Sequence, residues 1–236
     1  MRIAREIADW AAQAVILVFA TSTLAMPYVI PSASMESTLM TGDHVIVDKM
    51  AYAPASGALS HTLPYEQVRR GDIVVFRYPV DIRQDFVKRI VGIPGDRLHL
   101  SRGVLYRNGV RLDEPYVQHI AGSYDPYRDD FPNAPAPPLP DRAVEMLRDH
   151  VSAGDLVVPE GNYFGMGDNR DDSSDSRYWG LIPRENITGK PVIVFWSYDA
   201  PTEDLLDFNA RHFIDLAEHF FTRTRWRRTF MLVRPG

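Results

Sequence analysis

Short apolar stretches separated by glycine- and proline-containing turns dominate the chain after residue 43. Runs of this length, rich in valine, isoleucine and phenylalanine, are typical of β-strands. Asn108-Gly109, with apolar residues on both sides, indicates a tight hairpin turn. We therefore predict a mainly β protein. The predicted strands are His44–Asp48, Asp72–Arg77, Asp85–Val91, Arg97–Ser101, Gly103–Tyr106, Val110–Leu112 and Pro191–Trp196.

A proline-rich segment interrupts this pattern over 124–141 and predicts an extended loop. Ala143–His150 has the composition of a short helix beside that loop. We predict that about 101–160 forms a secondary lobe, inserted in a β core that occupies 31–200.

The N-terminal region contains a long uncharged segment, with no Asp, Glu, Lys or Arg from Trp10 through Met35. Residues 10–30 would span about 30 Å as a helix, roughly one hydrocarbon core. We therefore predict a single transmembrane anchor over 10–30. Pro27 is expected to end or kink this helix, because proline lacks the amide hydrogen that helix interiors need.

Basic residues near the anchor predict its orientation. Arg2 and Arg5 precede it, whereas the first basic residue after it is Lys49. The positive-inside rule then places residues 1–9 in the cytoplasm and the body on the extracytoplasmic side of a bacterial inner membrane. A cleaved secretory signal is the alternative, since Thr23-Leu24-Ala25 resembles a small-residue cleavage site. Both interpretations export the body.

The C-terminal segment, 201–236, has apolar residues at roughly helical spacing, followed by four arginines around Trp226. One interpretation is an amphipathic helix that packs on the body and ends in a solvated basic turn. The other is contact with anionic lipid headgroups through arginine and tryptophan.

Composition excludes several classes of chemistry. The 236 residues carry a formal net charge of −5, which gives no support for nucleic-acid binding. There are no cysteines, so thiolate catalysis and disulfides are excluded, and the seven histidines show no metal-ligand spacing. We predict neither a metal nor a cofactor.

Two residues suggest nucleophilic catalysis. Ser34 lies among small residues directly after the uncharged segment, and Lys88 lies within a predicted strand among apolar neighbours. A serine hydroxyl needs a base, and a lysine acts as one only when burial lowers its pKa and leaves it neutral. Alternation places Phe86, Lys88 and Ile90 on one strand face. A lysine that extends from a half-buried strand to water explains the same pattern.

Four blocks in order resemble the bacterial type I signal peptidases, membrane-anchored Ser/Lys proteases that remove signal peptides from exported preproteins. They are Pro31–Leu39, Arg70–Phe76, Asp85–Asp96 and Gly165–Gly180. The resemblance implies an antiparallel β-barrel or sheet core with an inserted lobe. It also implies cleavage after small-x-small sites, with preproteins and the lipid bilayer as partners.

Residue roles follow from the resemblance by position. It implies that Ser34 is the nucleophile and Lys88 the general base, with the Ser34 N–H and the Ser32 hydroxyl as oxyanion donors. Ser173 is expected to hydrogen-bond and orient the Lys88 amine. The remaining matched positions comprise four pocket residues, an ion pair and three scaffold residues. They are Ile30, Val45, Phe86 and Val87; Asp175 and Arg177; and Asp168, Arg170 and Asp171.

Two positions depart from the family pattern. Ser37 occupies a place where the family usually has proline, so we expect a less rigid turn with no loss of a catalytic group. Asp172 replaces the more common asparagine. If its carboxylate points inward, it raises the pKa of Lys88.

Three other functions fit parts of the sequence. A self-cleaving repressor shares Ser/Lys chemistry but would lack a membrane anchor, and a β scaffold that binds partners would need no catalysis. A Ser/His esterase would need a histidine beside Ser34, although none has an activating context such as GxSxG. The candidate histidines are His44, His61, His99, His119 and His150.

Overall fold

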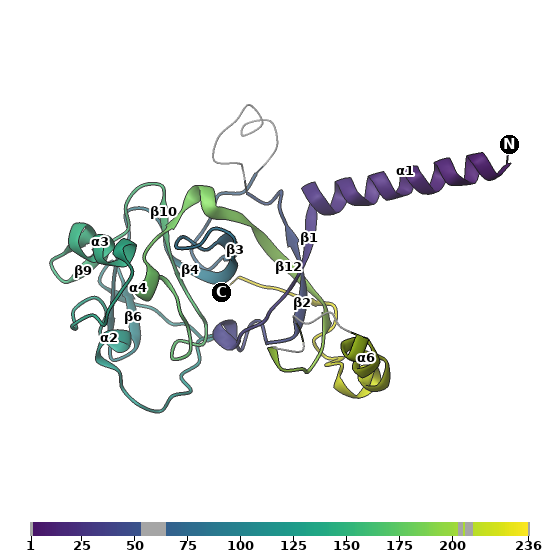
Figure 1. Ribbon diagram of the computed structural model, residues 1–236. Coiled ribbons are helices and arrows are strands. Elements are labelled where there is room, and N and C mark those ends of the chain that lie inside the picture. Colours follow the sequence, from purple (N-terminus) through teal and green to yellow (C-terminus); the bar gives the residue numbers. More distant parts are fainter. Residues whose placement is uncertain (1, 53–64, 203–204, 206–209, 236) are drawn as a thin grey trace.

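Two antiparallel sheets form the body of the protein in the computed structural model, which describes residues 2–52, 65–202, 205 and 210–235 (Figure 1). The mainly antiparallel β fold predicted from the sequence is confirmed. The strands of the larger sheet, in spatial order, are β1 (Ala25–Val29), β2 (Asp43–Asp48), β12 (Ile187–Ser197), β3 (Ile73–Arg77), β4 (Asp85–Gly92), β10 (Asn162–Met166) and β11 (Ile182–Pro183), with β13 (Met231–Leu232) also paired to β12.

The smaller sheet lies at the far side of β4 from β1 (Figure 1). Its spatial order is β7 (Val110–Arg111), β6 (Val104–Arg107), β5 (Arg97–Ser101), β9 (Asp155–Val157) and β8 (Val151–Ser152). The helices α2 (Pro126–Asp129) and α3 (Asp141–His150) lie between β7 and β8 in the chain. This sheet occupies much of the range predicted for the secondary lobe.

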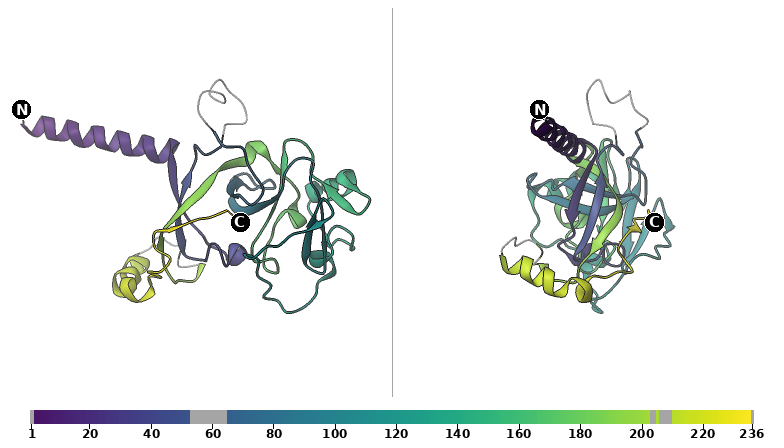
Figure 2. Two further views of the ribbon diagram at one scale, coloured as in Figure 1. Left: turned by 180° about the vertical axis from the view of Figure 1, so that it is seen from behind. Right: turned by 90° about the vertical axis from the view of Figure 1, so that its right-hand side faces the viewer.

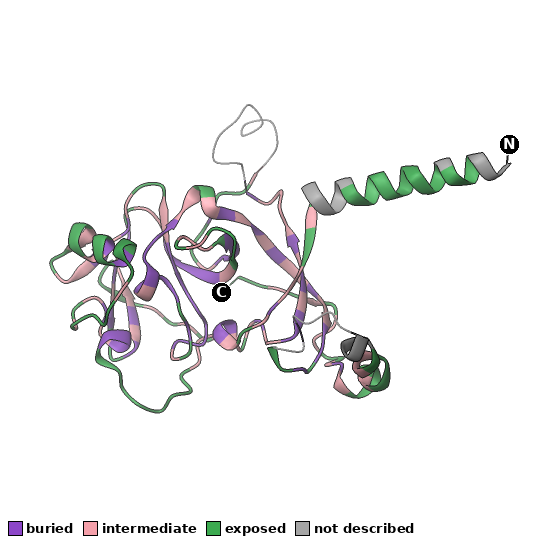
Figure 3. Cartoon of the chain, viewed as in Figure 1, coloured by how far each residue is buried: buried purple, intermediate pink, exposed green. Residues whose placement is uncertain are grey.

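Buried apolar side chains form several clusters, and the one under the smaller sheet also includes side chains of β4 and β10 from the larger sheet (Figure 3). In the smaller sheet, Leu98 and Leu156 pack with Phe131. In the larger sheet, Phe76 packs 5.6 Å from Trp179, measured between ring centroids. Trp179 ends the short helix α4 (Ser176–Trp179), so this contact ties α4 to the sheet beside the site described below.

The predicted transmembrane helix over 10–30 is wrong in its bounds. The helix α1 runs from Arg2 to Thr23 and extends away from the body, whereas residues 25–29 form β1 and pair with β2 (Figure 2). Pro27 disfavours a continued helix, because it lacks the amide hydrogen that the helix would need. It is tolerated in β1 because this strand lies at the edge of the sheet. Within the described part of the chain, no helix has both the length and the apolar character that crossing a membrane requires.

The C-terminal segment is also less helical than predicted. The helix α6 covers Ala210–Arg223, and the chain then returns to the larger sheet as β13. Part of the predicted helical pattern, at 203–204 and 206–209, lies outside the described residues.

Two arginines after α6 bind the loop that connects the first candidate block to β2. Arg225 Nη1 donates to Thr41 O at 2.7 Å, and Arg228 Nη2 donates to Thr38 O at 2.9 Å. Arg228 also contacts both carboxylate oxygens of Asp43, which is fully buried. The last residues of the chain are therefore attached to the loop at 38–43.

Two glycines provide a test of how closely this loop packs. Gly42 and Gly95 have almost the same positive φ, +86° and +87°. A Cβ at Gly42 would lie 1.9 Å from Tyr198 O, whereas one at Gly95 would meet nothing within 4 Å. We expect Gly95→Ala to lower the free energy of unfolding by about 1 kcal/mol, from backbone strain alone. Gly42→Ala should cost at least about 2 kcal/mol more, because the backbone must move. Urea unfolding of both variants measures the difference, and equal losses would contradict the packing.

Candidate active site

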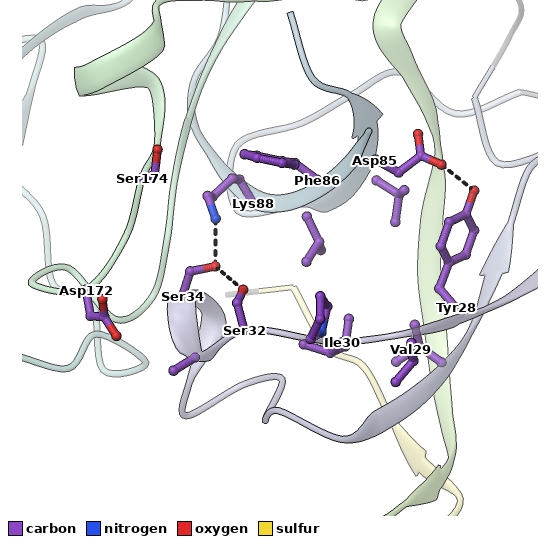
Figure 4. A pocket seen from close by; sticks show the side chains of 15 residues that line it. Tyr28, Val29, Ile30, Ser32, Ser34, Asp85, Phe86, Lys88, Asp172 and Ser174 are labelled. Atoms are coloured by element: carbon purple, nitrogen blue, oxygen red, sulfur yellow. Dashed lines mark hydrogen bonds between the residues drawn. The ribbon is translucent and has the colours of Figure 1, made fainter. Parts of the chain in front are cut away.

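Ser34 and Lys88 lie side by side in the structure, although 54 positions separate them in the sequence (Figure 4). Lys88 Nζ is 2.7 Å from Ser34 Oγ, a hydrogen-bond distance. Ser34 is 8% exposed and Lys88 4% exposed, so little water reaches the pair. The two residues have the geometry of a nucleophile and its base.

The turn that carries Ser34 is held by a loop from the fourth block. Ser34 is central in the 3-10 turn η1 (Ala33–Met35). The Asn169 N–H donates to Ser34 O at 3.2 Å, and Asn169 Nδ2 donates to Ala33 O at 3.3 Å. Gly167 allows this approach, because a Cβ there would lie 2.3 Å from Ser34 O. The loop at 167–169 thus holds the backbone on which the Ser34 hydroxyl is carried.

Lys88 projects from β4 into a largely apolar environment. Burial lowers its pKa to about 8, and the positive charge of Arg177 acts in the same direction. The carboxylates of Asp175, Asp168 and Asp172 oppose this effect and raise the pKa. Burial dominates because the ammonium form loses its hydration without gaining a direct ion pair. A substantial fraction of Lys88 is therefore neutral in mildly alkaline solution.

Two buried ion pairs limit how strongly nearby carboxylates act on Lys88. Asp175 and Arg177 are both almost fully buried, with Arg177 Nη2 2.7 Å from Asp175 Oδ2. Burial by itself would raise the pKa of Asp175, but Arg177, together with the charge of Lys88 and the Gly167 N–H, lowers it. Asp168 makes an equally buried pair with Arg89 at 2.7 Å. The negative charge of each carboxylate is therefore largely balanced by the positive charge of the arginine paired with it.

The other predicted members of the site differ in how the structure places them. Ser32 Oγ is 3.4 Å from Ser34 Oγ, beside the candidate nucleophile. Ser173 does not make the expected hydrogen bond to Lys88. Its hydroxyl is buried and has no hydrogen-bond partner among the described residues. Ser173 Oγ instead lies next to Gly167, at 2.3 Å from the point that a Cβ would occupy.

A pocket of about 390 Å³ opens beside Ser34 and Lys88 (Figure 4). Ile30, Val45, Phe86 and Val87, the four residues predicted to line it, all do so. Strand β1 forms one side of this pocket and the start of β4 the other. The Tyr28 hydroxyl bridges the two strands by donating to Asp85 Oδ2 at 3.0 Å.

The predicted scaffold residues join the fourth block to the rest of the body. Arg170 pairs with Glu114 at 2.6 Å, and Asp171 accepts hydrogen bonds from the Ala121 N–H and pairs with His119. The side chain of His99 pairs similarly with Asp155. His61 lies outside the described residues.

Both departures from the family pattern have a structural context. The Ser37 hydroxyl donates to Tyr116 O at 3.2 Å, which attaches this turn to the segment before the proline-rich loop. Asp172 lines the pocket, and its charge raises the pKa of Lys88 as expected.

Sequence reasoning missed two contributors to the site. Tyr28 falls within the predicted membrane anchor, and Asn169 has no predicted role. The signal for Asn169 was its place within the fourth block, directly between residues already identified as scaffold.

A family model described as "Signal peptidase, peptidase S26" matches residues 4–196. The signal peptidase I of Pseudomonas aeruginosa is 35% identical over 201 residues, which is 76% of this chain and 68% of that protein. The signal peptidase I of Aquifex aeolicus is 35% identical over 219 residues, 79% of this chain and 81% of that protein. The signal peptidase IB of Staphylococcus aureus is 32% identical over 207 residues, covering 82% and 92%.

A solved signal peptidase I from Enterococcus faecalis V583 is 32% identical and covers 53% of this chain and 97% of its own. Its TM-score of 0.39 is too low to support an argument about the fold. The family model reaches across the segments that carry Ser34, Lys88 and the loop at 167–169. The chain therefore belongs to the type I signal peptidases of peptidase family S26, serine peptidases that remove signal peptides.

Proposed function

We propose that this enzyme cleaves the signal peptide with Ser34 as nucleophile and Lys88 as general base. The observation that carries the proposal is the 2.7 Å separation of the two groups, combined with a lysine pKa lowered to about 8 by burial. A lysine in water would be almost entirely protonated at that pH and unable to accept a proton.

The reaction proceeds in two stages. Neutral Lys88 takes the proton of Ser34 Oγ, and the oxygen attacks the scissile carbonyl carbon to form a tetrahedral intermediate. The Ser34 N–H and the Ser32 hydroxyl donate to the oxyanion. The Lys88 ammonium then protonates the leaving amine, and the C–N bond breaks to give an acyl-enzyme. Lys88 next removes a proton from water, which hydrolyses the ester.

The substrate binds as an extended strand between β1 and β4. The outer edge of β1 pairs with no other described strand, and β10 pairs with β4 only from Arg89 onwards. The segment 85–88 therefore has one edge open toward the pocket. Backbone hydrogen bonds to these edges would hold any peptide sequence, which suits an enzyme with many preprotein substrates.

Small side chains at the first and third residues before the scissile bond (P1 and P3) fit the apolar pocket beside Ser34. Side chains two residues apart on a strand point to the same face, so P1 and P3 enter together. Ile30, Val45 and Phe86 restrict the space available. This restriction favours alanine at both positions and supports the small-x-small specificity.

The extracytoplasmic location of the body remains a prediction.

The first test replaces the base. Lys88→Met keeps an unbranched side chain, one atom shorter, but removes the amine, and should lower kcat for a model preprotein by at least about 10³-fold. Ser34→Ala should have a similar effect. Lys49→Met, a lysine outside the site, is the matched control. Processing by the Lys88 variant at the wild-type rate would contradict the mechanism, and loss of activity on replacing a histidine instead would favour a Ser/His mechanism.

The second test is the pH profile. Since neutral Lys88 is the reactive form, kcat/KM should rise with pH and level off above an apparent pKa of about 8. Asp172 raises this pKa, so Asp172→Asn should move the rising limb to lower pH. Asp113→Asn, which removes an exposed carboxylate elsewhere, should leave the limb in place. If the rising limb of the pH profile is unchanged in Asp172→Asn, the charge of Asp172 does not affect the pKa of Lys88.

We further propose that the C-terminal segment contacts anionic lipid headgroups. Phe221, Trp226 and Phe230 are 78%, 51% and 74% exposed. Residues 210–235 contain six arginines and two acidic residues, a formal charge of +4 within a chain of −5. Exposed aromatic side chains beside arginines are typical of protein surfaces that bind the membrane interface.

Fluorescence quenching tests this contact. Vesicles of brominated anionic phospholipid should quench the fluorescence of Trp226, so Trp226→Phe should show less quenching than the wild type. Trp10→Phe, which removes a tryptophan from α1, reports any contribution of the N-terminal helix. Equal quenching of the wild type and Trp226→Phe would refute lipid contact by the C-terminal segment.

A further inference from the structure

A second pocket, of about 280 Å³, lies beside the first and shares Tyr28 and Val29 with it. It is formed between the larger sheet and the helix α6, and we name it the β1–α6 groove. Its other lining residues are Pro27, His44, Trp196, Tyr198, Leu205 and Leu216. The lining contains no Asp, Glu, Lys or Arg, so the groove suits an apolar group.

The two pockets meet at the edge strand β1, where Tyr28 and Val29 line both, but cross-strand pairing associates each pocket with a different row of side chains. Tyr28 pairs with Val45, which pairs with Val194, and this row belongs to the face of the first pocket. The adjacent row is Val29, His44 and Trp196. Neighbouring residues of a strand point to opposite faces, so this second row faces the β1–α6 groove.

The wall of the groove opposite the sheet comes from the C-terminal segment. Leu205 and Leu216 line it, and both follow residue 196, where the match to the family model ends. Leu216 packs with Val29 and Trp196 around buried Tyr198. The hydroxyl of Tyr198 donates to Asp215 Oδ2 at 3.0 Å, which attaches α6 to the sheet. The groove is therefore built partly by residues beyond the match to the family model.

We propose that the β1–α6 groove binds an apolar side chain of the preprotein at the second or fourth residue before the scissile bond (P2 or P4). This inference rests on the proposed function, in which the substrate extends the sheet next to β1. In a substrate strand added next to β1, alternate side chains would extend the row of Tyr28 on one face and the row of Val29 on the other. If P1 and P3 occupy the first pocket, P2 and P4 project to the face of Pro27 and Val29, where the groove opens.

A leucine in the groove would be removed from water by Trp196 and Leu216, whereas a carboxylate would lose hydration without meeting a lysine or an arginine. The enzyme should thus select at P2 or P4 for apolar character, in addition to the selection for small residues at P1 and P3. Pocket contacts of this kind change kcat/KM by about tenfold.

The test uses model preproteins that differ only at P2 or only at P4, carrying Ala, Leu or Asp. For the wild-type enzyme we expect leucine to give a kcat/KM about tenfold above that for aspartate at one of the two positions. The same kcat/KM for all three residues at both positions would overturn the inference. Ser34→Ala is assayed in parallel to separate the two proposals. If activity is lost in Ser34→Ala but kcat/KM does not depend on the residue at P2 or P4, only the proposed role of the groove is rejected.

Variants of α6 assign the preference to the groove. Leu216→Ala removes part of the wall and should reduce the leucine-to-aspartate ratio several-fold. Ile214→Ala is the matched control, since it makes a similar change on the same helix at a side chain that is 57% exposed and does not line the groove. The ratio is measured within each variant, so a general loss of folded enzyme cancels. An unchanged ratio in Leu216→Ala would show that the preference arises elsewhere.

Discussion

A lysine amine kept from water beside a serine hydroxyl is the contact on which the rest of the site depends. Three carboxylates act on Lys88 in the direction that would keep it protonated, yet burial prevails. Asp175 and Asp168 are each paired with a buried arginine, and the positive charge of the arginine reduces the effect of the carboxylate on the pKa of Lys88. The ion pairs around the site thus hold the loop at 167–177 in place without restoring the charge of the lysine.

Most strands could be predicted from the sequence because their signals are local. The strand predicted at Asp85–Val91 is observed at Asp85–Gly92, and the one at Arg97–Ser101 has the same bounds. Strand β1 could not be predicted in this way. Residues 25–29 continue an uncharged run and include Pro27, and only their pairing with β2, at an edge where proline is tolerated, distinguishes a strand from the end of a helix.

For the site as well, the residues could be identified from the sequence, but the contacts that depend on the fold could not. The local pattern pointed to Ser34 and Lys88, and the resemblance to a family added their roles and four of the residues that line the first pocket. It also led us to expect a hydrogen bond from Ser173 that the structure lacks, because a motif states which residues are near one another and not how each hydroxyl is oriented. The β1–α6 groove was beyond prediction, since it requires α6 to pack against a strand about 190 positions earlier in the chain.

The attachment of Arg228 to Asp43 joins two residues that are 185 positions apart in the chain. The loop that follows the serine therefore depends on a distant segment for its support. A proteolytic cut between α6 and β13 that released this segment would leave the buried carboxylate of Asp43 without its arginine, at the start of the strand that forms the pocket floor with Val45.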